Sequence, residues 1–419
     1  MNFSEASEYV LGLKPHDFHL SLGAIEKACA IFDHPERSFP SVHIAGTNGK
    51  GSTAAFLRAI CLQHEIDVGL YTSPHLIDVR ERIQIGHGMI PEDAFTALTD
   101  EMIQKDLRLT YFEFLTIMAF LYFREREVPL AIIETGLGGR LDATNVITPF
   151  VSILTPIGFD HMRHLGDTLA AITVEKCGII KPGIPVVTAV QQPEVMAVIQ
   201  ETCEQRGCEL TIALPEEIDA PLGLGGEHQR QNAACAVAAA KMMASRFSLT
   251  ALEDALAFAT WPGRLETVWQ HPKVIVDGAH NPHGAEALAE ALQKLAPPKK
   301  ISLMFGAYQD KDVQGMLSAL LPKVREIICV SAPTERGMQP TAIAELSRES
   351  GKSVILCDSI PDALHFFLTK ASADDIFIAA GSLSIVAEVK KYFYDLSEHS
   401  PSSAPQNRNA SIHGGRNFA

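Results

Sequence analysis

The feature that most constrains the fold is a series of short apolar runs, rich in β-branched residues and separated by segments with helical patterning. Four such runs lie in the first half of the chain: "SVHIA" (41–45), "LAIIETG" (130–136), "FVSILTPIG" (150–158) and "GIPVVTAV" (183–190). Strands that are apolar on both faces and are joined by helical crossovers form mainly parallel sheets. This half is therefore predicted to be an α/β unit that binds its ligand at the carboxyl ends of its strands.

A second strand–loop–helix series starts beyond the Pro-Gly break in "WPGRLE" (261–266), and its first run is "KVIVDGAHN". A chain of 419 residues is too long for one ordinary hydrophobic core. We predict a P-loop-containing, mainly parallel α/β domain over residues 1–270 and a smaller Rossmann-like α/β domain over residues 271–396. Residues 397–419 are polar and rich in Ser, Asn and Gly, which predicts a disordered tail.

Charge and cysteine content argue against several classes of protein. The formal net charge of -15 disfavours a general binder of nucleic acid or of anionic membranes. The most apolar helical stretch, residues 114–123, is too short to span a bilayer, and the first residues lack the pattern of a signal peptide. The eight cysteines form no C-x-x-C pair, which favours reduced thiols over a disulfide framework or a zinc site. We expect a cytoplasmic protein.

The glycine-rich stretch "HIAGTNGKGST" lies between the first apolar run and a helical segment. Gly46, Gly49 and Gly51 allow backbone N–H groups to turn toward an anion at the start of that helix. Lys50 would neutralise phosphate charge, and Ser52 would be able to bind Mg²⁺. The spacing departs from an ordinary P-loop because a glycine separates the lysine from the hydroxyl residue. The alternative is a tight turn with a solvated lysine, but the strand–loop–helix order favours phosphate binding.

Three further charged or titratable residues are candidates for a functional site because of where they stand relative to the apolar runs. Glu134 ends one strand, where it is placed to hold Mg²⁺ or to order water, although it can also be a merely solvated acid. His161 follows another strand, but Mg²⁺ prefers oxygen ligands and a lone histidine is more often structural. Lys176 lies in an apolar helical segment, where a buried lysine needs a partner or a chemical change. It either pairs with Glu175 or another acid, or belongs to an active site.

An ordered set of motifs runs through nearly the whole chain apart from its tail: "GTNGKGS", "YTSPHL", "ERI", "YFEFLT", "ETGLGGRLDATN", "EKCGIIKPG", "WPGR" and "DGAHNP". Together they resemble the bifunctional dihydrofolate synthase/folylpolyglutamate synthase family, which belongs with the Mur ligases. The resemblance implies an ATP-dependent amide ligase that adds L-glutamate to dihydropteroate and to folates through an acyl phosphate. It also implies two Mg²⁺ sites and a monomer whose partners are small molecules: dihydropteroate, reduced folates and L-glutamate.

The resemblance implies the site residues as well. The residues expected to bind ATP come from both domains: Asn48, Gly49, Lys50, Gly51, Ser52, Asn232, Arg264, Asp277 and His280. The residues expected to hold Mg²⁺ are Ser52, Ser73, Glu134, His161 and Lys176, the last as a carbamate that supplies anionic oxygen. The residues expected to line the pterin pocket are Thr110, Tyr111, Phe112, Glu113, Leu141, Asp142 and Ala143. Lys50, Lys176 and His161 are expected to be catalytic, in a site that forms when the domains close.

Two departures from the family pattern bear on these expectations. Cys177 stands where the family usually has alanine, and "HLSLGAIEKA" (19–28) fits the N-terminal pterin loop only loosely. A folylpolyglutamate synthase without the dihydrofolate synthase activity is therefore one alternative. A Mur-type ligase acting on a UDP-linked peptidoglycan precursor is a second alternative, and a P-loop switch or motor is a third.

Overall fold

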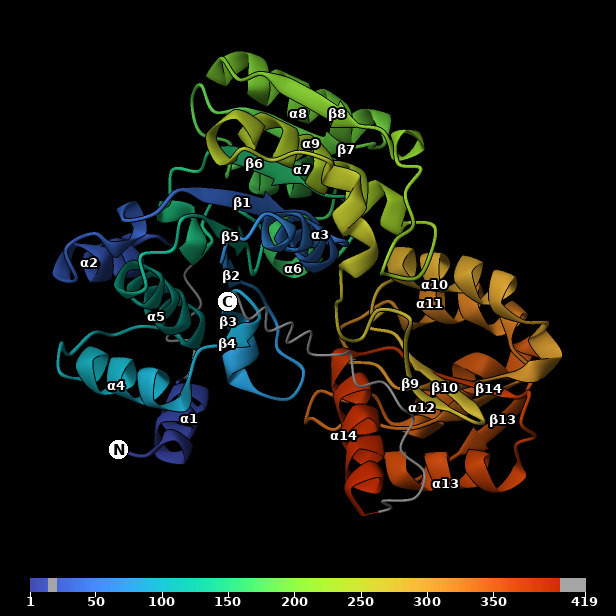
Figure 1. The fold of residues 1–419 in the computed structure, drawn as a ribbon. Coiled ribbons are helices and arrows are strands. Elements are labelled where there is room, and N and C mark those ends of the chain that lie inside the picture. The colour runs from blue at the N-terminus through green and yellow to red at the C-terminus, as the bar shows by residue number, and fades with distance from the viewer. Residues whose placement is uncertain (14–20, 400–419) are drawn as a thin grey trace, which may run out of the picture.

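The structure, a computed structural model, describes residues 1–13 and 21–399. These residues form two α/β units, each built on its own sheet, that lie side by side in Figure 1. From residue 400 onward, the predicted disordered tail lies outside the described residues, and its first residues belong to the last helix.

The first unit contains an eight-stranded sheet in the order β4-β3-β2-β5-β1-β6-β7-β8. Its strands are β1 (Ser41–Ala45), β2 (Gly69–Tyr71), β3 (Ile83–Ile85), β4 (Gly88–Met89), β5 (Ala131–Glu134), β6 (Val151–Leu154), β7 (Val186–Ala189) and β8 (Leu210–Ala213). In the row β2-β5-β1-β6-β7-β8 every neighbouring pair is parallel. Only the pairs β2–β3 and β3–β4, at one edge of the sheet, are antiparallel. The predicted mainly parallel sheet is confirmed.

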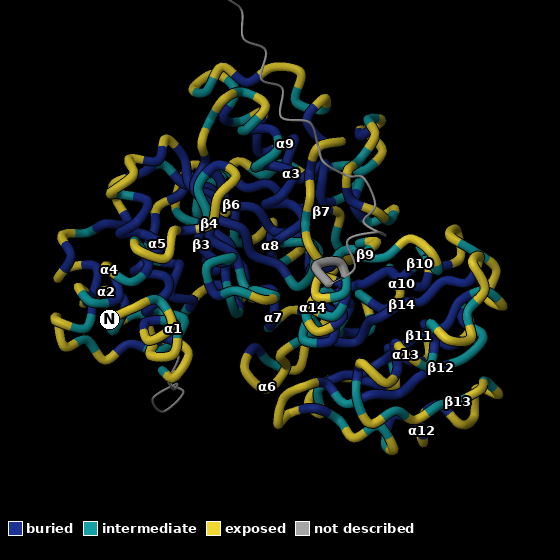
Figure 2. Tube along the Cα trace, turned by 60° about the horizontal axis from the view of Figure 1, so that its bottom comes forward, coloured by how far each residue is buried: buried dark blue, intermediate teal, exposed yellow. Residues whose placement is uncertain are grey.

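Helices cover both faces of this sheet because its strands are apolar on both sides. Ile132 of β5 belongs to the core beneath α3 and α9, whereas the next residue, Ile133, belongs to the core beneath α1, α2, α4 and α5. The helices of this unit are α1 (Phe3–Gly12), α2 (Gly23–Ile31), α3 (Lys50–Gln63), α4 (Glu92–Ile103), α5 (Tyr111–Glu125), α6 (Met162–Leu165), α7 (Leu169–Cys177), α8 (Pro193–Arg206) and α9 (Gln229–Phe247). The inner strands of both sheets are buried in Figure 2, and exposed residues concentrate on loops, edge strands and outer helix faces.

The second unit contains a six-stranded sheet in the order β13-β12-β11-β14-β10-β9. Its strands are β9 (Glu266–Gln270), β10 (Lys273–Val276), β11 (Ile301–Phe305), β12 (Glu326–Cys329), β13 (Ser353–Leu356) and β14 (Ile376–Ala380). Its helices are α10 (Pro282–Leu295), α11 (Val313–Leu320), α12 (Pro340–Ser347), α13 (Ile360–Lys370) and α14 (Leu383–His399). All strand pairs are parallel except the edge pair of β9 and β10.

This second sheet begins before residue 271, where we predicted the second domain to start. β9 pairs with β10 as a hairpin, with Gln270 opposite Lys273. As an edge strand it is only partly buried, so "ETVWQ" lacks the continuous apolar run that marks the inner strands. Short 3₁₀ helices complete the two units: η1 (Pro35–Arg37), η2 (Val79–Arg82), η3 (Ala143–Val146), η4 (Pro215–Glu217), η5 (Leu252–Phe258), η6 (Pro298–Lys300), η7 (Leu321–Lys323) and η8 (Arg348–Ser350).

The centre of the first sheet determines where a ligand can bind. β1 pairs with β5 on one side and with β6 on the other, and both pairs are parallel. The connections that leave the carboxyl ends of these strands therefore diverge to opposite sides of the sheet, which opens a crevice at that edge. The glycine-rich loop follows β1, Glu134 is the last residue of β5, and His161 comes after β6.

Candidate active site

The loop between β1 and α3 has a backbone that only glycine allows at two positions. Gly49 precedes α3 with a φ of 86°, and a Cβ at this position would lie 2.2 Å from Oδ1 of Asn232. A Cβ on Gly46 would lie 1.9 Å from Oγ1 of Thr155. No side chain caps the start of α3, so its first N–H groups are left to an anion, which the helix dipole also favours. The loop has the construction of a phosphate site.

Gly51, which separates this loop from an ordinary P-loop pattern, lies against the linker to the second unit. A Cβ on Gly51 would lie 2.7 Å from Nε1 of Trp261. Trp261 precedes β9 and packs against the core that contains α3. The contact with the indole therefore requires the glycine, and it joins the glycine-rich loop directly to the linker.

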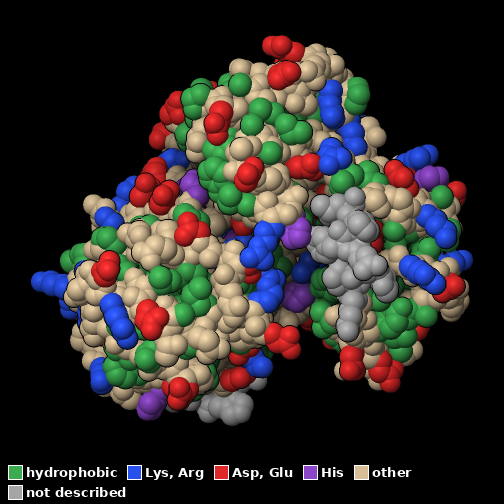
Figure 3. All heavy atoms as spheres, turned by 180° about the vertical axis from the view of Figure 1, so that it is seen from behind, with side chains coloured by type: hydrophobic (Ala, Val, Ile, Leu, Met, Phe, Trp, Pro, Cys, Tyr) green, Lys and Arg blue, Asp and Glu red, His purple; other side chains and the backbone are tan. Residues whose placement is uncertain are grey.

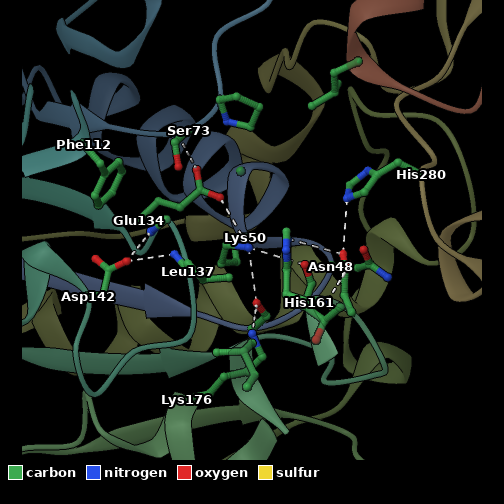
Figure 4. A pocket seen from close by; sticks show the side chains of 18 of the residues that line it. Asn48, Lys50, Ser73, Phe112, Glu134, Leu137, Asp142, His161, Lys176 and His280 are labelled. Atoms are coloured by element: carbon green, nitrogen blue, oxygen red, sulfur yellow. Dashed lines mark hydrogen bonds and ion pairs between the residues drawn. The ribbon is translucent and has the colours of Figure 1, made fainter. Parts of the chain in front are cut away.

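Glu134 occupies the centre of the site at the end of β5, as Figure 4 shows. Its side chain is buried, and Oε2 accepts a hydrogen bond of 3.1 Å from the backbone N–H of Ser73. Nζ of Lys50 lies 3.9 Å from Oε1. Burial raises the pKa of Glu134, although the charge of Lys50 and the N–H of Ser73 oppose this shift. A buried carboxylate with so little compensation is suited to bind a further cation.

Lys176 and Lys50 both donate to the same carbonyl oxygen, that of Gly46, over 2.8 Å and 3.2 Å. Lys176 is buried, and among the described residues it forms no ion pair. The suggested pairing of Lys176 with Glu175 is wrong, because the carboxylate of Glu175 binds Arg140 at 2.8 Å. Burial, reinforced by the charge of Lys50, lowers the pKa of Lys176 to about 7. Near neutral pH a substantial fraction of this amine is therefore uncharged and nucleophilic.

His161 follows β6 and stands at the start of α6 with a φ of 50°. Burial lowers its pKa to about 4, although the neighbouring carboxylate of Asp160 opposes this shift. The imidazole is therefore neutral at physiological pH, which is the form that binds a metal. Burial disfavours the charged form of Asp160, but His280, His161 and Lys311 outweigh burial and hold its pKa well below the usual range. Asp160 is thus ionised throughout the physiological range.

Asp160 also joins the two units. Its Oδ1 accepts a hydrogen bond of 2.5 Å from Nζ of Lys311, and Nε2 of His280 lies 3.6 Å from Oδ2. Beside it, Asn48 of the glycine-rich loop and Asn281 of the second unit exchange two side-chain hydrogen bonds of 3.1 Å and 3.0 Å. The glycine-rich loop is therefore held from both units, as expected for a site that both domains complete. Figure 3 shows the hollow between the units, where Lys, Arg and His side chains gather.

The predicted pterin pocket lies on the opposite side of Glu134 from the glycine-rich loop, near Phe112 and Asp142 in Figure 4. Thr110 caps α5, and Glu113 returns the capping hydrogen bond. Asp142 accepts hydrogen bonds from the N–H groups of Gly136 and Leu137, which shapes the turn after β5. Burial raises the pKa of Asp142, whereas these hydrogen bonds oppose that shift. The pocket thus combines aromatic rings with a buried, fully oriented carboxyl group.

The glycine-rich loop, the metal-ligand candidates and the aromatic pocket line one cavity of about 600 Å³, a size typical of small-molecule sites. Most of the residues predicted from sequence lie on its wall: Asn48, Gly49, Lys50, Gly51, Ser73, Thr110, Tyr111, Phe112, Glu113, Glu134, Leu141, Asp142, Ala143, His161, Lys176, Arg264 and His280. Three predicted residues are not on the wall: Ser52, Asn232 and Asp277. Ser52 is buried in α3, and Asn232 lies against Gly49. Asp277 accepts the N–H groups of Leu265 and Ala279 and so holds the turn beside Arg264.

Some cavity residues were not predicted as site residues, notably Lys311, Tyr308 and Arg82, although Arg82 belongs to the "ERI" motif. Asp160 had a weak signal, since it is an acid directly past a strand. The loosely matching stretch 19–28 begins outside the described residues, and Ser21 within it lines the cavity. Among the described residues, no group of three or more His, Cys, Asp and Glu side chains forms a metal site, and no helix has the length and hydropathy of a membrane span.

Comparisons with known proteins identify the class of this fold and site. Residues 263–383 match the family model described as "Mur ligase, glutamate ligase domain". The chain is 36% identical to the dihydrofolate synthase/folylpolyglutamate synthase of Bacillus subtilis, over 93% of this chain and 98% of that protein. It superposes with a TM-score of 0.86 on Escherichia coli FolC in complex with DHPP and ADP, at 30% identity over 96% of this chain and 99% of that chain.

A third match is the Yersinia pestis folylpolyglutamate synthase/dihydrofolate synthase with AMPPNP and a Mn ion, at a TM-score of 0.85 and 28% identity over 94% of this chain and 98% of that chain. Fold, nucleotide loop and family model together define a Mur-type ATP-dependent ligase. Within that class, the chain belongs to the dihydrofolate synthase/folylpolyglutamate synthase family. The resemblance inferred from the ordered motifs is confirmed.

Proposed function

We propose that this chain joins L-glutamate to dihydropteroate and to folates, with ATP activating the acceptor carboxylate as an acyl phosphate. The observation that carries the proposal is a single cavity in which Glu134 lies between the glycine-rich loop at Lys50 and the aromatic pocket at Tyr111 and Phe112. A nucleotide phosphate and a flat ring with a carboxylate tail fit the two ends of this cavity. The family membership supports the same chemistry.

This reaction depends on neutralised charge and on exact placement of two substrates more than on a protein nucleophile. We propose that Lys50 and the N–H groups from Gly49 to Ser52 hold the ATP phosphates, next to Asn48. Arg264 and His280 reach the cavity from the second unit, which supports their proposed contact with ATP. Asn232 and Asp277 support those contacts indirectly, because Asn232 lies against Gly49 and Asp277 holds the turn after β10.

The donor set fits divalent cations, and a Mn ion is present in the Yersinia relative. Glu134 is a buried carboxylate with one hydrogen bond from Ser73, and His161 is held neutral. We propose two Mg²⁺ sites, the first at Ser52, Ser73 and Glu134, the second at Glu134, His161 and Lys176. The place of Ser52 rests on the family resemblance. The ions would neutralise phosphate charge close to the acceptor carboxylate.

The environment of Lys176 supports the proposed carbamate. Its lowered pKa provides the neutral amine that adds to carbon dioxide, with loss of one proton and formation of an N–C bond. The product is an anionic oxygen donor in place of a cation. It would also remove the repulsion between Lys176 and Lys50, which share the carbonyl of Gly46. A lysine among metal ligands is thereby explained.

Product analysis tests the function. The chain is incubated with ATP, Mg²⁺ and labelled L-glutamate, and dihydropteroate, tetrahydrofolate or a UDP-linked peptidoglycan precursor is offered separately. We expect labelled products from the first two acceptors only. Products from tetrahydrofolate alone would support the folylpolyglutamate synthase alternative. Products from the UDP-linked precursor alone, or ATP turnover that needs no glutamate, would overturn the proposal.

We also propose that the enzyme works as a monomer in the cytoplasm. The cavity is completed by both units of one chain, so the proposed chemistry needs no second subunit. All eight cysteines are free thiols, as in proteins of reducing compartments. The small-molecule partners remain those of the proposed reaction.

A further inference from the structure

Arg82 forms no ion pair with any acid among the described residues, although its charge acts on Glu134 across the cavity. It is the last residue of η2, it lines the cavity, and only 7% of it is exposed. Among the described residues its guanidinium donates one hydrogen bond of good geometry, from Nε to Nδ1 of His75, over 2.8 Å. Removing a guanidinium from water costs free energy that a ligand anion can offset. By contrast, Arg264 also lines the cavity but is partly exposed, so water can solvate it.

Two neighbours fix the orientation of this guanidinium. The ring of Tyr111 lies under it, with Cζ of Arg82 5.1 Å from the ring centroid. His75 binds its Nε edge, and because arginine can only donate, Nδ1 of His75 must be the acceptor. The two terminal Nη groups remain as a planar fork.

A second polar group near Arg82 also lacks a partner. The hydroxyl of Tyr111 is buried and has no hydrogen bond in the structure. Burial raises the pKa of Tyr111, whereas the charge of Arg82 and a side-chain interaction of its guanidinium with the hydroxyl oppose this shift, so the two groups lie close together. A planar fork of N–H donors beside a phenol hydroxyl matches a carboxylate, which accepts two parallel hydrogen bonds from arginine.

The position of Arg82 identifies the carboxylate. Its charge acts on Glu134, which lies between the aromatic pocket and Lys50. An anion at Arg82 therefore lies where the acceptor's acid group must meet the nucleotide phosphate. Lys311 and Arg336, two of the cations that the second unit brings to the cavity, are already engaged, since Lys311 pairs with Asp160 and Arg336 with Asp310. They offer no equivalent fork at this place.

We propose that Arg82 binds the carboxylate of the pteroate or folate acceptor and presents it for phosphorylation, with His75 as the residue that positions Arg82. This inference rests on the proposed function. It makes Arg82 a determinant of specificity, because the aromatic pocket holds the ring system while Arg82 selects for the acid group attached to it.

The test compares two ligands that differ only in that acid group: dihydropteroate and its analogue with a phenyl ring in place of the benzoate. Binding of each is measured by calorimetry with wild type, Arg82→Met and a matched control, Arg80→Met. Arg80 lies on the same 3₁₀ helix but pairs outside the cavity with Asp78 and Glu92. Wild type and Arg80→Met should prefer the acid by about 10- to 100-fold, the range for hydrogen bonds to charged groups.

Arg82→Met should bind both ligands about equally and retain the affinity for the phenyl analogue, because only the charged contact is lost. Loss of affinity for both ligands would indicate a structural role and overturn the inference, as would a retained preference. Arg82→Lys cannot form the two-pronged contact, so it should lose most of the preference too. In turnover, the KM for dihydropteroate should rise and that for glutamate should stay unchanged; the opposite pattern would overturn the inference.

His75→Leu provides the test of positioning, because it removes the acceptor but leaves the guanidinium. It should lower the preference for the acid by less than Arg82→Met does, without changing affinity for the phenyl analogue. A wild type that binds neither compound would overturn the proposed function itself. A wild type that forms product while Arg82→Met keeps its preference would overturn only the role of Arg82.

Discussion

The contact between Gly51 and Trp261 gives the sharpest prediction from the geometry, and the perturbation is Gly51→Ala. Gly51 lies inside α3 with ordinary helical backbone angles, so the backbone itself accepts alanine. Alanine should even stabilise the helix by about 0.5–1 kcal/mol relative to glycine. The new Cβ, however, would lie 2.7–2.9 Å from three atoms of the indole of Trp261. Overpacking of this kind costs about 1–3 kcal/mol.

The two effects oppose each other, so the sign of the change should depend on Trp261. In the wild-type background, Gly51→Ala should lower the free energy of unfolding by up to about 2 kcal/mol. In the Trp261→Leu background the clash is relieved, and the same substitution should raise the free energy of unfolding by about 0.5–1 kcal/mol. Urea unfolding followed by circular dichroism, without ligands, measures all four corners of this cycle.

Gly49→Ala is the matched control, because its cost comes from a φ of 86° and from Asn232 rather than from the indole. It should destabilise both backgrounds by similar amounts. If Gly51→Ala changed the free energy of unfolding equally in both backgrounds, the indole would not be the reason for this glycine. The departure from ordinary P-loop spacing would then need another explanation.

Three further predictions concern charged groups of the site. The lowered pKa of Lys176 means that, between pH 7 and pH 10.5, the folded chain binds fewer protons than the unfolded chain, so stability from this group increases as pH rises through that window. In buffer free of carbon dioxide, the free energy of unfolding of Lys176→Met should therefore exceed that of wild type by roughly 5 kcal/mol below pH 7, and by progressively less toward pH 10. An exposed control, Lys299→Met, should show no such trend. A gain for Lys176→Met that does not depend on pH would refute the reasoning. Glu134→Gln should abolish Mg²⁺-dependent ligation without loss of the fold, since glutamine has the shape of glutamate but carries no charge to bind the cation; normal turnover would move the metal site elsewhere. Asp160→Asn should weaken the contact with Lys311 and reduce the rate of ligation by about tenfold or more, because a charge-assisted hydrogen bond between the units is lost. Small-angle scattering with ATP present should then show a more extended molecule. An unchanged radius of gyration together with a normal rate would contradict the role of Asp160 in joining the units.

The inner strands and the glycine-rich loop were predictable because local sequence specifies them. Ile132 and Ile133 both had to be apolar for β5 to be covered on its two faces, and such runs are visible without a structure. β9 was not predictable in this way, because an edge strand is half exposed and carries no continuous apolar run. Its membership of the second sheet depends on the hairpin with β10, which is a tertiary pairing.

The residues of the candidate site likewise divide into those that local sequence predicts and those that depend on the assembled structure. Glu134 and His161 are visible in the sequence because each follows a strand, and the topology then brings them together. Arg82 belongs to the "ERI" motif, but its role was not predictable from it, since its significance lies in what surrounds it: a buried position, a histidine acceptor and no ion pair among the described residues. The pairing of Lys176 with Glu175, suggested by their adjacency, fails because the helix directs Glu175 toward Arg140. Charge balance in a buried site is a property of the assembled structure.

The position of Trp261 has a practical consequence. The chain contains only two tryptophans, Trp261 and Trp269, and both lie at the passage from the first unit to the second. One contacts the glycine-rich loop, and the other stacks on Phe393 of α14 with ring centroids 5.2 Å apart. The tryptophan fluorescence of the enzyme therefore originates at the linker and at the first strand of the second unit. Rearrangement of the two units around a nucleotide can be followed in real time by emission, without any attached dye.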